Sequence, residues 1–178
     1  LVPPVQAFGS GFDLGAKHIN PDIEILKTYH PGAIEVAFGD PEWGATTSRQ
    51  AMDNGADVIF AAGGATGNGG LIEIASEADA GSRVFCIGVD LDQWYSVPEA
   101  QPCLITSAEK HMVQGVSDLI VQAAAGEMPT GNVYGTVGLA PYHDFDSQIS
   151  DEIKATIEDI AAALNDGSMV TGHEFGME

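Results

Sequence analysis

The chain has 178 residues, 44% of them apolar, which suffices for the core of a single domain. It carries 26 acidic residues against six lysines and arginines, for a formal net charge of −20 at pH 7. This charge excludes nucleic acid as a partner, because clusters of basic side chains are needed to bind phosphate. No apolar run approaches the roughly 18 residues of a membrane span, and the first residues lack the pattern of a signal peptide. The opening is typical of the middle of a protein, so we expect a fragment or a processed form.

Apolar residues alternate along the chain between the spacing of helices and that of strands. The first helix is indicated by Val5, Phe8 and Phe12, which recur at steps of three and four. The predicted helices cover residues 4–19, 46–55, 71–80, 108–125 and 147–167. The predicted strands cover residues 22–29, 57–62, 83–89, 103–107 and 132–140. This alternation is typical of an α/β fold with a parallel, doubly wound sheet.

Three chemically unusual stretches follow predicted strands, at residues 63–70, 90–95 and 106–110. In doubly wound sheets, ligands bind beyond the carboxyl ends of the strands. Each stretch also has a plain structural interpretation as a turn or a helix start. Their shared position nevertheless favours a ligand site at this edge of the sheet.

The first stretch, GGATGNGG, begins with Gly63 and Gly64. Its glycine spacing differs from that of the dinucleotide-binding fingerprint, and no Gly-Lys-Ser/Thr follows as in a phosphate-binding P-loop. Two interpretations remain open. Either the loop brings backbone N–H groups close to a ligand at the start of the next helix, or it is only a tight turn between a strand and a helix.

The second stretch begins with Asp90, directly after a buried apolar strand. A carboxylate has two acceptor oxygens and can therefore bind both hydroxyls of a vicinal diol, such as those of a ribose. Asp92 and Gln93 are interpreted as residues that fix the turn, while Trp94 and Tyr95 either cover the loop or line the cleft. The simpler alternative is that the strand merely ends in a turn, where Asp is common.

The third stretch contains Lys110. Thr106 and Glu109 have the spacing of a capping box, which predicts that a helix begins here. A lysine in the first turn of a helix opposes the helix dipole, so we expect Lys110 to donate a hydrogen bond to a ligand. The alternative is a surface lysine balanced by Glu109. Ser107 and Lys110 also match the Ser-x-x-Lys pair of β-lactamases, but the companion motifs of those enzymes are missing.

The remaining reactive residues suggest no catalytic or metal site. The five histidines are scattered without metal-ligand spacing, and we expect no metal and no cofactor. Cys86 and Cys103 are either two buried thiols or, if their strands are neighbours in an oxidising compartment, a disulfide. Phe60, near the end of a strand, is more readily interpreted as a core residue than as a stacking platform. We therefore expect a binding protein and not an enzyme.

Several motifs in order resemble the basic membrane protein (BMP) family, purine-nucleoside-binding lipoproteins that serve ABC importers. These motifs are FGSGFDLGAKHINPDIEI, GDPEWG, NGADVIFAAGGATGNG, IGVDLDQ, CLITSAEK and VGLAPYHDFD, spread over residues 8–167. The resemblance implies a type I periplasmic binding protein, in which two α/β lobes close on a ligand. This chain is similar to the carboxyl-side lobe, over residues 1–130. Residues 131–178 would form a crossover strand and a final helix that return toward the missing amino-terminal lobe.

The resemblance also implies roles for single residues. Asp90 would hold the ribose hydroxyls, Lys110 would reach the sugar, and Phe60 would stack on the base. The loop from Gly63 to Gly64 would pass close to the ligand. The implied partners are a purine nucleoside, an ABC permease and the amino-terminal lobe of the same protein. The implied location is extracytoplasmic, with a lipid anchor on the full-length protein.

Three other functions stay open at this point. A receptor of the same fold for a free sugar would need no platform for a base. A nucleoside-processing enzyme would need an acid, a base or a nucleophile near the sugar. A regulatory ligand-sensing domain is disfavoured by the net charge of −20, because such domains work together with DNA-binding helices.

Overall fold

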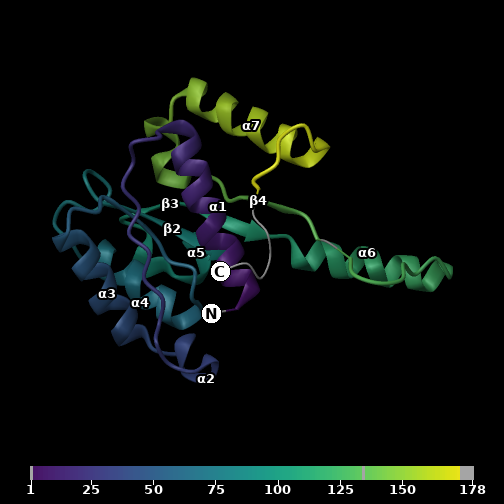
Figure 1. Ribbon diagram of the computed structural model, residues 1–178, viewed down its shortest axis with the longest axis horizontal. Coiled ribbons are helices and arrows are strands. Elements are labelled where there is room, and N and C mark those ends of the chain that lie inside the picture. The colour runs from purple at the N-terminus through teal and green to yellow at the C-terminus, as the bar shows by residue number, and fades with distance from the viewer. Residues whose placement is uncertain (1, 134, 173–178) are drawn as a thin grey trace.

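A four-stranded sheet forms the centre of the protein, with strand order β1-β2-β3-β4 (Figure 1). The computed structural model describes residues 2–133 and 135–172 of the chain. The strands are β1 (Val58–Phe60), β2 (Phe85–Asp90), β3 (Leu104–Lys110) and β4 (Val137–Leu139). Strands β1, β2 and β3 are parallel, and β4 runs antiparallel to β3. The predicted α/β fold with a mainly parallel sheet is therefore confirmed, with one antiparallel strand at its edge.

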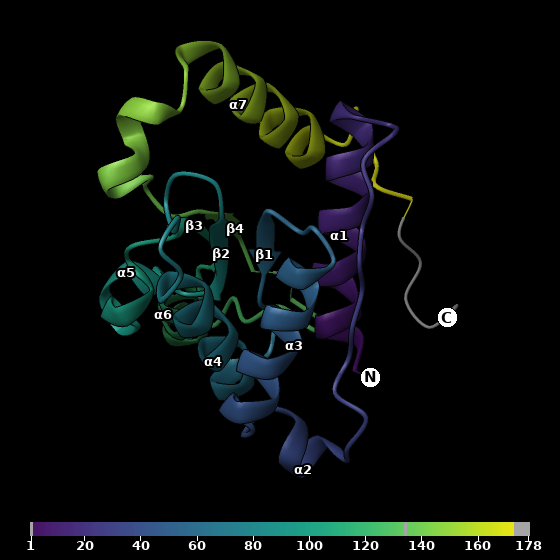
Figure 2. The ribbon, with the colours of Figure 1, turned by 90° about the vertical axis from the view of Figure 1, so that its left-hand side faces the viewer.

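Helices flank this sheet. They are α1 (Pro3–Ile19), α2 (Ile34–Ala37), α3 (Pro41–Asp53), α4 (Gly64–Ala75), α5 (Gln93–Ser96), α6 (Met112–Ala125) and α7 (Asp151–Asp166), with two 3-10 helices, η1 (Pro98–Ala100) and η2 (His143–Gln148). Figure 2 shows α1 beside β1, and α7 above the sheet in that view. Helices α3 and α4 pack against each other, and α4 also contacts β2. None of the helices in the described part of the chain is long and apolar enough to cross a bilayer.

The hydrophobic core lies between α4 and the two central strands. Leu71, Ile74 and Leu104 are almost wholly buried, and each contributes roughly 1.5–3 kcal/mol through burial of its side chain. Cys86 of β2 and Cys103, just before β3, belong to the same core. They form a disulfide with Cα atoms 5.2 Å apart. The sequence left open whether these cysteines are free thiols or a disulfide. The pairing of β2 with β3 brings their two sulfur atoms together.

Small residues allow α3 and α4 to approach closely. A Cβ atom added at Gly44 would overlap the backbone carbonyl of Thr66, and one added at Gly69 would overlap the backbone of α3. The prediction of a turn over residues 63–70 is wrong, because α4 already begins at Gly64. The glycines cost helix propensity, but the close packing of the two helices stabilises the conformation that they would otherwise disfavour.

Helix α3 begins at Pro41, earlier than the sequence predicts. Asp40 is its N-cap, and one oxygen of that carboxylate accepts a hydrogen bond from the Trp43 amide at 3.0 Å. The other oxygen lies 3.2 Å from Nε2 of His30. The Trp43 amide, and after it His30, hold the pKa of the Asp40 carboxyl below its ordinary value. The predicted start at residue 46 is wrong because Asp followed by Pro is itself a strong helix start.

Residues 22–30 form no strand, so the strand predicted over 22–29 is wrong. This segment runs irregularly from α1 toward α2 (Figure 2). Its Lys27 is held by Asp13 of α1, with 2.6 Å between Nζ and Oδ2. Hydrogen bonds from Lys17 and Lys27 hold the pKa of the Asp13 carboxyl below its ordinary value. The alternation of apolar residues in this segment therefore does not mark a strand, and Ile23 and Leu26 are exposed at 38% and 56%.

Candidate ligand-binding site

Asp90 lies at the carboxyl end of β2 in an unusual backbone conformation. Its φ angle is 70°, in the left-handed region that L-residues rarely adopt. The amide of Leu91 donates to the carbonyl of Val89 at 2.8 Å, which closes a three-residue turn around Asp90. Such a turn is strained, and strained residues tend to be kept at functional sites, where the surrounding structure holds them in place.

Lys110 is the last residue of the neighbouring strand β3. Its Nζ lies 2.7 Å from Oδ1 of Asp90, and the two side chains are 36% and 44% exposed. The pair is therefore accessible to a ligand. A partly exposed ion pair of this kind contributes little to stability, about 0–1 kcal/mol.

The predicted location of Lys110 early in a helix is wrong. Residues 104–109 pair with β2 in parallel register, with Asp90 opposite Glu109, Lys110 pairs with Val137 of β4, and α6 begins only at Met112. Thr106 does not cap a helix, because its hydroxyl donates to the Ala140 carbonyl at 2.7 Å. The strand pairing therefore prevails over the capping-box spacing. The correction leaves Lys110 at the same edge of the sheet as Asp90.

Phe8 of α1 joins the charged pair to an aromatic cluster. The ammonium of Lys110 lies 4.5 Å from the centroid of the Phe8 ring. Phe60, at the end of β1, meets the Phe8 ring edge-on with centroids 5.9 Å apart. It also stacks on Phe12 at 5.1 Å, with 16° between the ring planes. The sequence signals Phe8 and Phe12 only as members of the apolar face of a helix, so their place beside this site is a finding of the structure.

The glycine stretch supplies the start of α4 beside the end of β1. Gly63 is the N-cap of α4, and no side chain caps the helix at that position. Gly64 has φ of 59°, and a Cβ there would come within 3.2 Å of the Phe38 carbonyl oxygen. Whether their backbone approaches a ligand stays a prediction. Both glycines follow β1, so all five predicted binding residues lie at the carboxyl ends of three adjacent strands.

Gln93 supports the turn that carries Asp90. Its side-chain oxygen accepts from the Val89 amide at 2.7 Å, its side-chain nitrogen donates to Asn68 at 2.8 Å, and its own amide donates to the Ser107 hydroxyl at 3.1 Å. The side chain is buried, so these bonds satisfy groups that would be costly to leave unpaired. Gln93 thus connects β2, α4 and β3 directly behind the site.

Asp92 and Trp94 connect the same loop to the returning part of the chain. One Asp92 oxygen accepts from the Trp94 amide at 3.1 Å, and the other lies 2.9 Å from Nε2 of His143. The His143 ring stacks on Trp94 with centroids 4.6 Å apart. Tyr95 meets the same imidazole edge-on, but its own side chain is 74% exposed. Trp94 therefore packs against the returning part of the chain, and whether it covers the loop or lines a cleft stays open.

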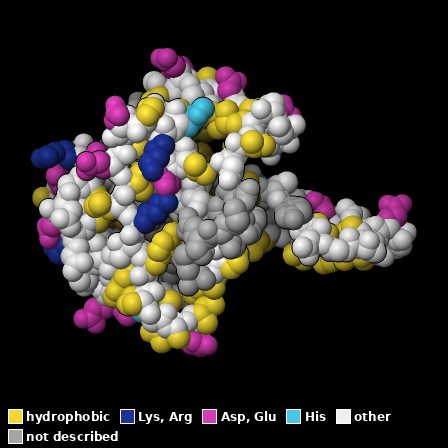
Figure 3. All heavy atoms as spheres, viewed as in Figure 1, with side chains coloured by type: hydrophobic (Ala, Val, Ile, Leu, Met, Phe, Trp, Pro, Cys, Tyr) yellow, Lys and Arg dark blue, Asp and Glu magenta, His cyan; other side chains and the backbone are white. Residues whose placement is uncertain are grey.

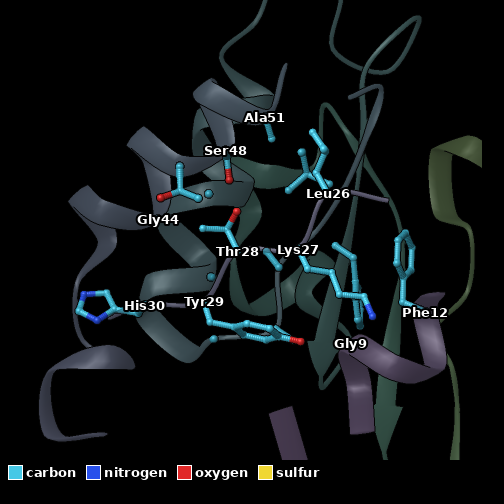
Figure 4. A pocket seen from close by; sticks show the side chains of 18 of the residues that line it. Gly9, Phe12, Leu26, Lys27, Thr28, Tyr29, His30, Gly44, Ser48 and Ala51 are labelled. Carbon is cyan, nitrogen blue, oxygen red and sulfur yellow. The ribbon is translucent and has the colours of Figure 1, made fainter. Parts of the chain in front are cut away.

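A cavity of about 560 Å³ lies beside the site, between α1, α3, β1 and the segment of residues 22–30 (Figure 4). Phe12, Phe60 and Gly63 line it, but Asp90 and Lys110 do not. The cavity is thus adjacent to the aromatic part of the site and separate from the charged pair. Figure 4 places Tyr29 and Lys27 between Gly9 of α1 and the α3 side of the cavity.

The chemistry of these groups suits a polar ligand with a flat apolar part. Asp90 offers acceptor oxygens, Lys110 offers donors, and Phe8 and Phe60 offer aromatic surface. Among the residues that the structure describes, no three His, Cys, Asp or Glu side chains gather closely enough to hold a metal ion.

Comparisons with known proteins identify the family of this chain. The model of the family described as "Bmp: ABC transporter substrate-binding protein PnrA-like" matches residues 2–140. The chain is 32% identical to a CD4+ T-cell-stimulating antigen of Listeria monocytogenes, over 93% of this chain and 48% of that protein. It is 41% identical to basic membrane protein A1 of Borrelia garinii, over 60% of this chain and 28% of that protein. The chain thus spans at most about half the length of these curated relatives.

Solved structures share the fold. A solute-binding protein of an ABC transporter system from Aeropyrum pernix K1 superposes with a TM-score of 0.76 and 22% identity. The superposition covers 97% of this chain and 56% of that one. A solute-binding protein from Conexibacter woesei gives a TM-score of 0.71 and 20% identity, with 95% and 53% covered. In both cases the neighbour has a large part with no counterpart here.

Proposed function

The chain belongs to the Bmp family of PnrA-like ABC transporter substrate-binding proteins, and from that premise we propose that it binds a purine nucleoside for an ABC importer. It works without catalysis, by closure of two lobes on the ligand, which the permease senses. This chain supplies one wall of the cleft. Binding loses translational and rotational entropy whatever the number of contacts. This chain alone makes few contacts with the ligand and therefore binds weakly, whereas the two-lobed protein binds tightly.

The observation that carries the proposal is the strained turn at Asp90 with Lys110 at 2.7 Å. A carboxylate accepts hydrogen bonds from both hydroxyls of a vicinal diol, and ribose presents such a diol. The ammonium holds the carboxylate in one orientation before the ligand arrives, which lowers the ordering cost of binding. Lys110 keeps further donor protons for an oxygen of the sugar.

The aromatic residues offer a surface on which the base of the nucleoside would stack. Phe8 is in contact with both Lys110 and Phe60, so flat apolar surface begins next to the charged pair. A nucleoside has the same order of parts, a diol on the sugar and a flat base attached to it. Phe60 is already stacked on Phe12, so the base stacks on its other face or displaces Phe12. We propose further that the backbone of Gly63 and Gly64, which follow the strand that ends at Phe60, passes close to the ligand.

The disulfide supports an extracytoplasmic location, since such bonds persist in oxidising compartments. We propose that the full-length protein is lipid-anchored at the outer face of the membrane, with the ABC permease as its partner.

The first test is calorimetric titration of guanosine into the two-lobed protein and its Asp90→Asn variant. Asn tolerates the left-handed backbone conformation, so the variant changes the carboxylate and leaves the turn intact. A hydrogen bond to a charged group is worth roughly 1.5–3 kcal/mol, so we expect affinity to fall about 10- to 100-fold. Asp79→Asn is the matched control, because that carboxylate is 42% exposed and forms an ion pair with Arg83, with 3.9 Å between Nε and Oδ2. Equal affinity for guanosine in Asp90→Asn and in the control would refute the assignment.

A receptor for a free sugar is the alternative, and Phe60→Leu separates the two. This variant keeps apolar volume but removes the ring. Loss of a stacking platform is expected to weaken guanosine binding about tenfold and to leave ribose binding unchanged. If ribose binds as tightly as guanosine to the unaltered protein, the ligand is a sugar. Release of free base from guanosine during the titration would instead indicate a nucleoside-processing enzyme.

A further inference from the structure

Asp92 pairs with His143 beside the loop that follows β2. Nε2 of the imidazole lies 2.9 Å from Oδ2 of the carboxylate, and the two side chains are 14% and 18% exposed. The side chains of the Asp90–Lys110 pair are more exposed, so solvent screens the Asp92–His143 pair less. Asp92 follows Asp90 by two residues. The pair therefore belongs to the loop that carries the proposed ligand-binding carboxylate.

Both Asp90 and His143 have an unusual backbone conformation. In the part of the chain that the structure describes, they are the two non-glycine residues with positive φ, at 70° and 46°. Glycine would adopt this conformation without steric cost. A larger residue is kept there only where the surrounding structure holds it in place. At residue 143 the imidazole makes those contacts, with Asp92 and with the ring of Trp94.

The segment that carries His143 is anchored to the sheet on both sides of this residue. On one side, the Ala140 amide donates to the Ser107 carbonyl at 2.9 Å, and the Ala140 carbonyl accepts from Thr106 of β3. On the other side, the buried Phe145 ring packs edge-on against Phe85 of β2, with centroids 6.0 Å apart. These contacts hold the segment in place without the imidazole. A substitution at residue 143 therefore changes the pair and leaves the segment docked.

We propose that His143 is a positioning residue for the ligand site, and that its protonation tightens the loop that carries Asp90. An imidazole is the side chain that ordinarily changes its charge between pH 5 and 8. When protonated, it makes a charge-assisted hydrogen bond to Asp92, which is roughly twice as strong as a neutral one. The loop is then better ordered before the ligand arrives, and affinity rises as the pH falls. This inference rests on the proposed function, because it takes Asp90 as the ligand-binding residue.

Other charged and titratable groups surround His143. Tyr95 of α5 meets the ring edge-on with centroids 5.5 Å apart, and Asp144 and Asp146 follow on the same segment. Asp146 pairs with Lys154 of α7 at 2.8 Å. Acidic side chains also lie over α7 and at the far end of α6 (Figure 3). Carboxylates, lysines and phenols ordinarily keep their charge between pH 5.5 and 8, so the field of these groups is constant over that range.

His111 is a second histidine near the ligand site. It follows Lys110, and its Nε2 lies 3.6 Å from Oε2 of Glu109. Its protonation adds positive charge beside the ligand and so changes affinity independently of His143. Tyr142, directly before His143, adds nothing in this range, because burial raises the pKa of its phenol. The contribution of His143 is therefore measured as the difference between proteins with and without the charge of its partner.

Hydrogen exchange of the Leu91 amide, which donates to Val89 within the loop, tests the proposal without ligand. In the two-lobed protein we expect its protection factor to be about three times higher at pH 5.5 than at pH 8. Asp92→Asn removes the charge and keeps an acceptor for the Trp94 amide, so we expect equal protection at both pH values. Equal protection in the unaltered protein would overturn the proposal. An unchanged pH dependence in Asp92→Asn would overturn it as well.

Titrations of guanosine at the same two pH values provide the functional readout. When the pH is lowered from 8 to 5.5, the unaltered protein should gain about threefold more affinity than Asp92→Asn. His143→Asn should lack the same gain, and Asn tolerates the positive φ at that position. His18→Gln removes an exposed histidine from the last turn of α1 and should keep the gain. An equal gain in all four proteins would refute the role of His143.

The two readouts separate failure of this inference from failure of the proposed function. A loss of affinity in His143→Asn that is the same at both pH values would assign the ring to packing alone and overturn the inference. Absence of guanosine binding at either pH would refute the proposed function. The exchange of the Leu91 amide would then still decide whether the Asp92–His143 pair holds the loop.

Discussion

Helix α6 contains a larger share of apolar residues than α4, nine of 14 against five of 12, and yet it is the more exposed of the two. Half of α4 is buried between α3 and the sheet, whereas α6 projects with its apolar face in solvent (Figure 1). The difference shows that burial is decided by the partner that an element finds and not by its own hydrophobicity. It divides the molecule into a body, in which helices cover the sheet, and an arm, α6, whose apolar residues are exposed.

The largest effect is expected from removing side-chain volume in the body. Leu71 of α4 has no exposed surface, so Leu71→Ala creates a cavity and should lower the free energy of unfolding by about 3–5 kcal/mol. Ile120→Ala in α6 removes a side chain that is 64% exposed and should change it by less than about 0.5 kcal/mol in this chain. Urea denaturation of both variants measures the contrast. Similar losses in the two would mean that α6 is packed in solution.

Replacing a glycine with alanine should destabilise the protein in the body and stabilise the helix in α6. Gly44→Ala forces a Cβ into the Thr66 carbonyl and should lower the free energy of unfolding by about 3 kcal/mol. Gly115→Ala in α6 meets nothing within 4 Å and should stabilise that helix by about 0.5–1 kcal/mol. Thermal unfolding measures the first, and hydrogen exchange of the α6 amides measures the second. Destabilisation by Gly115→Ala would indicate an undetected close contact on α6.

Loss of the disulfide should weaken the body and leave the arm unchanged. The bond between Cys86 and Cys103 closes a loop with a sequence separation of 17. Replacing both with Ala should lower the free energy of unfolding by about 2–3 kcal/mol, chiefly because the unfolded chain becomes less constrained. Denaturant midpoints of the variant, with the exchange rates of the α6 amides as the control, check this. An unchanged midpoint would show that the bond adds no stability.

The smallest expected effect is on the pH dependence of stability, through the N-cap of α3. Because the pKa of Asp40 is lowered by the Trp43 amide and His30, its stabilising contribution is present above its ordinary pKa near 3.8. That contribution is lost as the pH falls through the lowered value. Asp40→Asn keeps a capping group that does not titrate here, so its denaturant midpoint should depend less on pH between 5 and 2. Identical pH profiles of the two proteins would contradict the assigned role.

Three strands, and the position of Asp90 at the end of one of them, could be predicted from the sequence because each signal was local. Apolar runs indicated β1, β2 and β3, and Asp90 was conspicuous as a carboxylate directly after one of them. Membership of the family could be predicted as well, from motifs spread over the chain. The binding roles of Asp90, Lys110 and Phe60 remain predictions that the titrations test.

The errors arose where tertiary contacts decide between local alternatives. The sequence TSAE has the spacing of a capping box, but pairing with β2 keeps it in β3. The glycines after Gly63 suggest a turn, but close packing with α3 makes them helical. Phe8 could not be identified as part of the site, because its contact with Lys110 depends on where α1 lies against the sheet.

The central claim is that this chain forms one wall of a nucleoside cleft whose other wall belongs to the half outside it. Calorimetric titration of guanosine into the complete two-lobed protein and into the 178-residue chain tests it most directly. The account predicts submicromolar binding to the two-lobed protein and binding at least 100-fold weaker to the chain alone. Equally tight binding by the 178-residue chain, or no binding of guanosine by the two-lobed protein, would contradict it.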